Sequence, residues 1–332
     1  MKRMVPGRIC IAVLVPGLIL CCVPGLFAGS GLDTGLIQFV REIHLNGAQG
    51  KQSLKNLILG KTKKKDIKPS AICRINRHLL CITDAVNGSV IVLDNNGRIK
   101  KKISRAKGLK FISPVSACVD DAGNIYVSDS ARQVVVRFDS KYKFKGIFIS
   151  SSPKEKERRI TGIVFSKRAG AFYCVDTPNH RILCFDRQGK LKFSFGTRGA
   201  AHGQFNFPTH IAADNAFIYV TDALNFRVQV FDGSGKFIRV FGSPGRGGGN
   251  FSKPKGIAVD RERRIFVADA MFDNVQIFNS EGRFLYYFGG PGQGQGEFWM
   301  PTGIMVDPDG TIWVADTYNN RIQVFKLAEN SL

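Results

Sequence analysis

Histidines and glycine-rich segments are the first places in this chain to look for metal or phosphate chemistry. A zinc site needs several side chains that converge on one point, but the 332-residue chain has only five histidines, in five different structural positions: His44, His78, His180, His202 and His210. The glycine-rich segments 245–249 and 292–296 lack the Gly-Lys-Ser ending and the following helix of a phosphate-binding loop. The sequence therefore predicts no metal, no phosphate loop and no cofactor.

Lysine and arginine give the strongest functional signal, because 48 of them stand against 26 acidic residues and give a formal net charge of +22. The excess is concentrated in three segments of seven basic residues each, with one, no and two acidic residues: 51–68, 98–110 and 141–159. Much less positive charge lies in the equivalent later segments, which are 190–207, 236–253 and 283–300. A concentrated positive field attracts anions, so we expect a polyanionic partner.

Two interpretations of these basic segments stay open. As a binding face, they would contact the partner through Lys63, Lys64, Lys65, Lys100, Lys101, Lys102, Arg158 and Arg159. As surface decoration, lysines on outermost strands would only discourage edge-to-edge aggregation. That second account does not explain the basic residues expected in crossover segments, at 63–65 and 158–159.

Residues 1–30 have the features of a secretion signal. Basic residues near the start precede the apolar run 9–27, and the small residues Ala28 and Ser30 suit cleavage before Gly31. An uncleaved anchor is the alternative, because about 19 apolar residues could just span a bilayer, although two prolines interrupt the run. Lipid attachment is disfavoured, because the cysteine pair of this segment follows a leucine. We expect an exported protein, periplasmic or extracellular, or a membrane-anchored one if the signal is retained.

A sequence phrase recurs six times in the rest of the chain. Each copy ends its second apolar run with an aspartate, and these aspartates are 45 to 47 residues apart: Asp84, Asp129, Asp176, Asp222, Asp269 and Asp316. Within one unit, four apolar or alternating runs have strand length and none has helix length. Turn residues such as Asp307-Pro-Asp-Gly310 separate the runs.

Each unit is therefore expected to be a four-stranded antiparallel meander. A sheet that is apolar on both faces has to stack on its neighbours, so the repeats predict an all-β, six-bladed β-propeller. The expected repeats in residues 31–332 cover about 69–110, 114–159, 160–207, 208–253, 254–300 and 301–326. The last repeat stops after three strands, and segment 35–45 resembles the missing fourth strand. Joining both chain ends in one blade would remove two free strand edges.

Several motifs resemble the NHL-repeat family of six-bladed propellers. The matching phrases centre on Asp176-Thr-Pro-Asn-His-Arg181, Asp222-Ala-Leu-Asn-Phe-Arg227 and Asp316-Thr-Tyr-Asn-Asn-Arg321. The resemblance covers about residues 35–326 and implies an Asp–Arg pair inside these three blades. Ser89, Val134 and Asn274 replace the arginine elsewhere. The family's scaffold carries binding modules, some lyases and ligase-associated domains, so the resemblance specifies the fold far better than the function.

The first strands of a propeller line its central channel, where enzymes of this fold place their sites. Aligning the units brings one level of residues together: Ser70, Val115, Thr161, Thr209, Lys255 and Thr302. The next level holds Ala71, Ser116, Gly162, His210, Gly256 and Gly303. Neither level has the carboxylates or amides of calcium-dependent lactonase propellers, nor the histidines of zinc-dependent amidating lyases. His210 and Lys255 could contact an anionic ligand, or could simply line a water-filled channel.

Five cysteines remain after the expected signal: Cys73, Cys81, Cys118, Cys174 and Cys184. Counting outward from the turns predicts that Cys73 lies opposite Cys81 and that Cys174 lies opposite Cys184. In an oxidising compartment each pair could form a cross-strand disulfide, although cross-strand geometry is often strained. All five could equally be small buried hydrophobic residues.

The leading hypothesis is a non-catalytic exported binding module, monomeric, that docks a protein, an acidic polysaccharide or an anionic lipid surface. Membrane contact would be peripheral unless the N-terminal segment is retained, and export argues against a nucleic-acid partner. The alternative is a small-ligand receptor or a lyase- or hydrolase-type propeller enzyme that uses the channel around His210.

Overall fold

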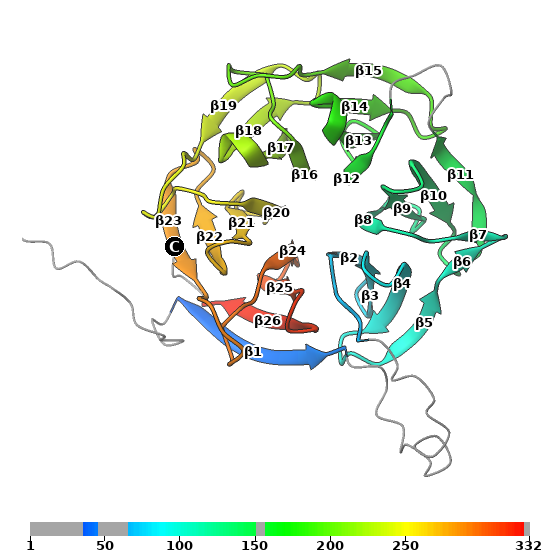
Figure 1. The fold of residues 1–332 in the computed structure, drawn as a ribbon, viewed down its shortest axis with the longest axis horizontal. Coiled ribbons are helices and arrows are strands. Elements are labelled where there is room, and N and C mark those ends of the chain that lie inside the picture. The colour runs from blue at the N-terminus through cyan, green and yellow to red at the C-terminus, as the bar shows by residue number, and fades with distance from the viewer. Residues whose placement is uncertain (1–35, 46–65, 151–156, 329–332) are drawn as a thin grey trace, which may run out of the picture. The chain divides into compact units, whose positions relative to one another are not determined.

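The computed structural model describes residues 36–45, 66–150 and 157–328. The described strands make six four-stranded antiparallel sheets around a central axis (Figure 1). The predicted six-bladed propeller is therefore confirmed. The signal predicted for residues 1–30 and the candidate residues Lys63, Lys64 and Lys65 lie outside the described residues. No helix among the described residues is long and apolar enough to cross a membrane.

The first three blades each run from the channel outward in chain order. Blade one contains β2 (Ala71–Asn76), β3 (Leu79–Asp84), β4 (Ser89–Asp94) and β5 (Ile99–Ile103). Blade two contains β8 (Pro114–Val119), β9 (Ile125–Asp129), β10 (Val134–Phe138) and β11 (Phe144–Ser150). Blade three contains β12 (Ile160–Ser166), β13 (Ala171–Asp176), β14 (Arg181–Phe185) and β15 (Leu191–Phe195). A short hairpin links blades one and two and consists of β6 (Arg105–Ala106) and β7 (Leu109–Lys110).

The last three blades repeat this order, except that the final strand of blade six comes from the start of the chain. Blade four contains β16 (Pro208–Ala213), β17 (Phe217–Asp222), β18 (Arg227–Asp232) and β19 (Phe237–Phe241). Blade five contains β20 (Pro254–Val259), β21 (Ile265–Asp269), β22 (Asn274–Phe278) and β23 (Phe284–Phe288). Blade six contains β24 (Pro301–Val306), β25 (Thr311–Asp316), β26 (Arg321–Leu327) and β1 (Ile37–His44). Turns of 3-10 helix follow two second strands, at Thr177–Asn179 and Ala223–Asn225.

The closing strand is confirmed by the pairing of β1 with β26. Phe39 lies opposite Phe325 and Ile43 opposite Ile322, in antiparallel register. The rings of Phe39 and Phe325 meet edge to face, with centroids 5.8 Å apart. Because β1 covers the free edge of β26, blade six has the same four strands as its neighbours.

The hydrophobic core is divided into six clusters, each between two adjacent blades. Phe266 and Val314 belong to the cluster between blades five and six, and Leu80 and Trp313 to the cluster that joins blade six to blade one. Second strands such as β9 and β21 are buried along their whole length, whereas β5 is exposed at four of its five residues. Each sheet thus buries both faces against neighbours, as the apolar runs predicted.

The strand register confirms one predicted cysteine pair and corrects the other. Cys73 lies opposite Cys81, as predicted. The prediction for Cys174 was wrong, because its partner is Leu183, while Cys184 lies opposite Tyr173. Since neighbouring positions on a strand point to opposite faces, Cys174 packs between blades two and three and Cys184 between blades three and four. The five described cysteines are free thiols, and burial raises the pKa of Cys118.

Candidate functional site

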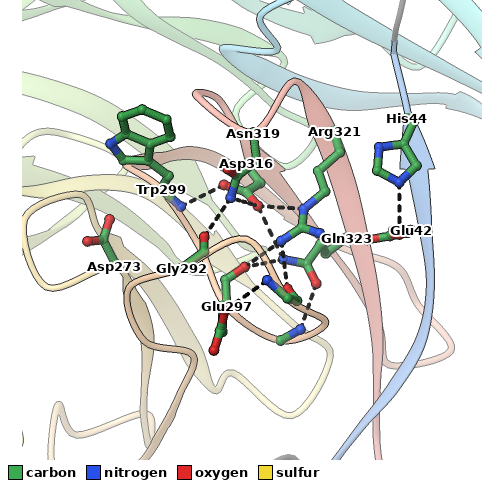
Figure 2. Close-up of polar contacts among 12 residues, drawn as sticks. Glu42, His44, Asp273, Gly292, Glu297, Trp299, Asp316, Asn319, Arg321 and Gln323 are labelled. Carbon is green, nitrogen blue, oxygen red and sulfur yellow. Dashed lines mark hydrogen bonds and ion pairs between the residues drawn. The ribbon is translucent and has the colours of Figure 1, made fainter. Parts of the chain in front are cut away.

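The aspartate that ends each second strand organises a polar network at one side of its blade. All six of these aspartate side chains are fully buried. In blade six, Arg321 Nε donates to Asp316 Oδ2 over 2.8 Å, and Arg321 Nη1 donates to Glu42 Oε2 of β1 over 2.7 Å. Figure 2 shows Arg321 between these two carboxylates. The Arg321 guanidinium therefore joins β26, the third strand of blade six, to β1.

The carboxylate that β1 supplies is tuned by its surroundings. Burial alone would raise the pKa of Glu42, but the hydrogen bond from His44 and the positive charge of Arg321 together lower it. His44 Nε2 lies 2.8 Å from Glu42 Oε1. The carboxylate therefore stays ionised where Arg321 needs a counter-charge, which makes this network a structural clamp.

The other two Asp–Arg pairs implied by the family resemblance are also present. Arg181 Nε donates to Asp176 Oδ2 over 2.9 Å, and Arg227 Nε donates to Asp222 Oδ2 over 2.8 Å. Arg227 also donates to three carbonyl oxygens of the crossover segment that precedes its blade, those of Ala200, Ala201 and Gln204. These contacts occupy the guanidinium donors of Arg227, so this pair holds the crossover loop in place.

His180 has a structural role at the turn of blade three. Its backbone φ is 53°, and its Nδ1 accepts a hydrogen bond of 3.1 Å from the Phe207 N–H. This ring nitrogen therefore fixes the start of the next blade. Among the described residues, no three His, Cys, Asp or Glu side chains are grouped in a way that could hold a metal ion.

The central channel contains a cavity of about 290 Å³, whose wall is built from the first strands. Ala71, Ser116, His210, Gly256 and Gly303 all lie on this wall, as the alignment of the units predicted. The glycines are required by close packing: a Cβ on Gly256 would collide with the carbonyl oxygen of Thr302 in the next blade. The channel is therefore narrow and mostly apolar at this level.

His210 is the histidine of this wall, which Cys73, Arg74 and Cys118 also line. Burial, reinforced by the positive charge of Lys255, lowers the pKa of His210 to about 3, so the imidazole is neutral at pH 7. Its Nδ1 is buried and has no hydrogen-bond partner within the described part of the chain. Burial also lowers the pKa of Lys255. The structure thus brings His210 and Lys255 close enough to interact, and leaves one ring nitrogen of His210 unpaired.

The basic residues around blades one and two form a continuous part of the outer edge. Figure 1 shows β5, the β6–β7 hairpin and β11 following one another along this edge. We call this set of exposed side chains the basic edge; it consists of Arg98, Lys100, Lys101, Lys102, Arg105, Lys107, Lys110, Lys141, Lys143 and Lys145. Only two of its lysines form ion pairs in the described residues, Lys100 with Asp94 and Lys145 with Asp139.

The outermost strands of blades three to five differ sharply from this edge. They read Leu-Lys-Phe-Ser-Phe in β15, Phe-Ile-Arg-Val-Phe in β19 and Phe-Leu-Tyr-Tyr-Phe in β23. The uneven charge predicted from the sequence therefore corresponds to a difference between neighbouring sectors of the propeller.

The two candidate arginines of blade three do not join the basic edge. Arg158 is buried, its Nη1 donates to the Ser150 carbonyl, and its guanidinium lies 5.9 Å from the centroid of the Phe185 ring. Arg159 is exposed but pairs with Glu157. Sequence reasoning placed both in a crossover, and could not see that one of them turns inward onto an aromatic ring.

Sequence reasoning also missed a set of exposed apolar side chains. They stand two residues after the buried aspartate in four units: Val86, Leu224, Met271 and Tyr318. Trp299 packs on Tyr318 with ring centroids 5.6 Å apart, and Lys68 Nζ lies 4.7 Å from the Tyr318 centroid. Because these are equivalent repeat positions, they share one face of the propeller. Reading the repeat in register at this position would have found them.

Two family models match parts of the chain. The NHL repeat matches residues 298–325, and a family described as a 6-bladed beta-propeller matches residues 209–271. The resemblance to NHL-repeat propellers predicted from the sequence is therefore confirmed. The search of curated proteins found no match.

Solved structures with the same fold have varied activities. An auxiliary nutrient binding protein from Bacteroides thetaiotaomicron is 12% identical with a TM-score of 0.65, over 87% of this chain and 76% of that chain. A virginiamycin B lyase from Staphylococcus aureus is 15% identical with a TM-score of 0.58, over 88% and 99% of the two chains. A gluconolactonase from Xanthomonas campestris is 14% identical with a TM-score of 0.60, over 87% and 98%. At these identities the likeness shows the fold alone.

Proposed function

Starting from a six-bladed propeller that carries an NHL repeat, we propose that this protein is a non-catalytic, exported binding module that docks an anionic surface through its basic edge. The observation that carries the proposal is the run of exposed lysines on β5, of which Lys101 and Lys102 have no ion pair among the described residues. Each such lysine keeps its full charge available for a polyanion. Acidic polysaccharide and anionic lipid headgroups both present the repeated negative charges that such an edge would bind.

The charge pattern favours a polyanion over a single small anion. The ten side chains of the basic edge are spread over two blades and a connecting hairpin, so they cannot converge on one point. Several separate contacts to repeated charges release several counterions, and affinity should therefore fall steeply with salt. Export of the chain, which rests on residues 1–30, is part of the same proposal.

The test compares two variants that remove the same charge from different sectors. Changing Lys101, Lys102, Arg105 and Lys110 to glutamine neutralises four exposed groups of the basic edge. The matched control changes four exposed groups of blades three and four to glutamine: Lys190, Lys192, Arg198 and Lys236. Arg239 is unsuitable for the control, because it donates to the Ser280 carbonyl and packs on Phe217.

Binding is measured with anionic lipid vesicles and with an acidic polysaccharide, each at several salt concentrations. We expect the basic-edge variant to lose at least about tenfold in affinity and to show a shallower salt dependence. The control variant should bind within a factor of about two of the parent. Equal losses in both variants would mean that only net charge matters, and unchanged binding in both would remove the basic edge as a docking surface.

The channel supports a second candidate function, binding of a small ligand beside His210. The supporting observation is the unpaired, buried Nδ1 of a neutral imidazole on the wall of a cavity of about 290 Å³. Propellers of the same fold include a virginiamycin B lyase and a gluconolactonase. If this candidate is right, a small-molecule screen should give ligands that His210→Gln abolishes, while the basic-edge variant binds them normally.

A further inference from the structure

The crossover loops before blades four and six have their carbonyl oxygens capped by an arginine of the following blade. In blade six, Arg321 Nη2 donates to the carbonyls of Gly294 and Glu297 over 2.7 and 2.8 Å. Figure 2 shows Arg321 beside Glu297. In blade four, Arg227 makes the equivalent bonds to loop 196–205. A nearby asparagine completes each cap, as Asn319 Nδ2 does by donating to the Gly292 carbonyl over 2.8 Å.

The loop before blade five is built in the same way but lacks this cap. Gln276 donates to the Asn250 carbonyl over 2.7 Å and accepts from the Gly249 N–H over 2.8 Å. Gln229 and Gln323 hold the loops before blades four and six in the same way. However, Asn274 stands where the arginine would be, and Phe272 stands where the asparagine would be. The carbonyls of Gly245 and Arg246 accordingly accept no hydrogen bond from the described residues.

The missing arginine leaves an open pocket of about 590 Å³, which we call the loop pocket. Asn274 lies in its wall, and Asn274 Oδ1 is a buried oxygen without a hydrogen-bond partner in the described chain. Asp269, fully buried next to it, receives only backbone N–H groups, including those of Ser252 and Lys253. Within the described ranges its charge therefore has no cationic partner, unlike that of the aspartates in blades four and six.

The remaining walls suit a planar cation. Phe226, Phe272 and Tyr287 line the loop pocket, together with the exposed side chain of Met271. A guanidinium group stacks on aromatic faces while its edge donates up to five hydrogen bonds, whereas an ammonium group offers a compact, strongly hydrated charge. The unpaired acceptor of Asn274 and the aromatic walls of the loop pocket match the first of these two groups.

We propose that the loop pocket binds a guanidinium group of a ligand, in the place that Arg227 and Arg321 fill in the neighbouring blades. This site is separate from the basic edge and selects the opposite charge, so neither proposal depends on the other. Arg246 also lies at the pocket; its positive charge opposes a cationic ligand, so Arg246→Gln should bind more tightly than the parent.

The test titrates the whole mature chain with blocked amino acids by calorimetry. N-acetyl-arginine methylamide should bind at one site at least about tenfold more tightly than N-acetyl-lysine methylamide, which carries the same charge. Agmatine is the third probe: binding of agmatine as well would show that a small guanidinium compound suffices, whereas binding of the blocked arginine alone would indicate a polypeptide ligand. Equal affinity for arginine and lysine, or binding of none of the probes, would overturn the proposal.

Two variants locate the site. Asn274→Arg restores the residue found in blades four and six, so it should fold with a raised melting temperature and lose arginine binding. Asn225→Phe combined with Arg227→Asn copies both departures of blade five into blade four, where Asn225 and Arg227 now cap the loop, and should add a second binding site. Retained binding in Asn274→Arg would place the guanidinium site elsewhere and refute the proposal, even if the double variant proved too unstable to measure.

Discussion

Blade six and blade two use the same strand order but hold their buried aspartates in different ways. In blade six, Asp316 is paired with Arg321, which also reaches the crossover loop and β1. In blade two, Val134 replaces the arginine, and the described part of the chain gives Asp129 backbone N–H groups only, from Ile112, Ser113 and Arg132. The aspartate alone is thus enough to form the turn, whereas the arginine ties distant segments to it.

The same two blades differ in where they keep their positive charge. Blade six places a guanidinium in its interior, with 4% of the side chain exposed. The edge around blade two instead carries lysines in solvent, for example Lys141 and Lys143. We infer that interior arginines stabilise the propeller and that exterior lysines serve binding.

Removing the closing strand should have the largest effect. Deleting residues 31–46 takes away β1, the packing of Ile37 and Ile43, and the Glu42 partner of Arg321. The edge of β26 would be left unpaired and prone to aggregate. We expect insoluble protein, or a melting temperature at least roughly 10 °C lower in a thermal scan. An unchanged melting temperature would show that blade six does not depend on β1.

Replacing each interior arginine by alanine should destabilise the protein in the order of burial. The exposed fractions of the side chains are 4% for Arg321, 11% for Arg227 and 31% for Arg181. Breaking a buried ion pair leaves an uncompensated charge and costs about 3 to 5 kcal/mol, so Arg321→Ala should approach that value and Arg181→Ala should stay well below it. Urea unfolding of the three variants measures the order. Equal effects would contradict the division between interior and exterior charge.

Acid should reveal the partly buried imidazole of the channel. The pKa of His210 is about 3 in the folded chain and about 6.5 in the unfolded chain. Between these two values the unfolded state binds a proton at His210 and the folded state does not. The contribution of His210 to the free energy of unfolding is fully present above pH 6.5. It falls by about 2 kcal/mol between pH 7 and pH 5. His210→Gln should flatten this part of the profile. An identical profile in parent and variant would mean that water reaches the imidazole.

Changes on the basic edge should have the smallest effect on folding. The variant with glutamine at Lys101, Lys102, Arg105 and Lys110 should keep its free energy of unfolding within about 0.5 kcal/mol, because the replaced groups are exposed. Urea unfolding checks this beside the binding measurements. A loss of unfolding free energy comparable with that of Arg227→Ala would mean that these four side chains stabilise the fold.

Much of the fold could be predicted because the same sequence pattern recurs in each of the six blades. Six aspartates at nearly equal spacing located every second strand, and the missing fourth strand of blade six located β1. The cysteine register failed for a local reason. Counting from the turn placed Cys174 opposite Cys184, but the actual hairpin pairs Asp176 with Arg181, which moves every partner by one residue and places the two thiols on different faces.

The loop pocket was less predictable. A departure from the repeat shows which side chain is absent, but it does not show whether neighbouring side chains fill the space. Asn274 was recognised as a departure from the arginine, yet the loop pocket exists only because Phe272 also fails to cap the loop and Gln276 still holds it open. Similarly, sequence alone could place Arg158 in a crossover but could not show that it turns onto Phe185. Such outcomes depend on side-chain packing between segments far apart in the chain.

The pairing of β1 with β26 has a consequence for the order in which the chain folds. Phe39 and its partner Phe325 are far apart in the sequence. β1 can therefore pair only after β26 has been synthesised. Until then β1 is an unpaired edge with apolar residues, and closure requires a contact of very large sequence separation, which slows folding. Blades one to five can each form from continuous sequence as they emerge. We therefore expect completion of blade six, which joins the two ends of the chain, to be the slow step of folding.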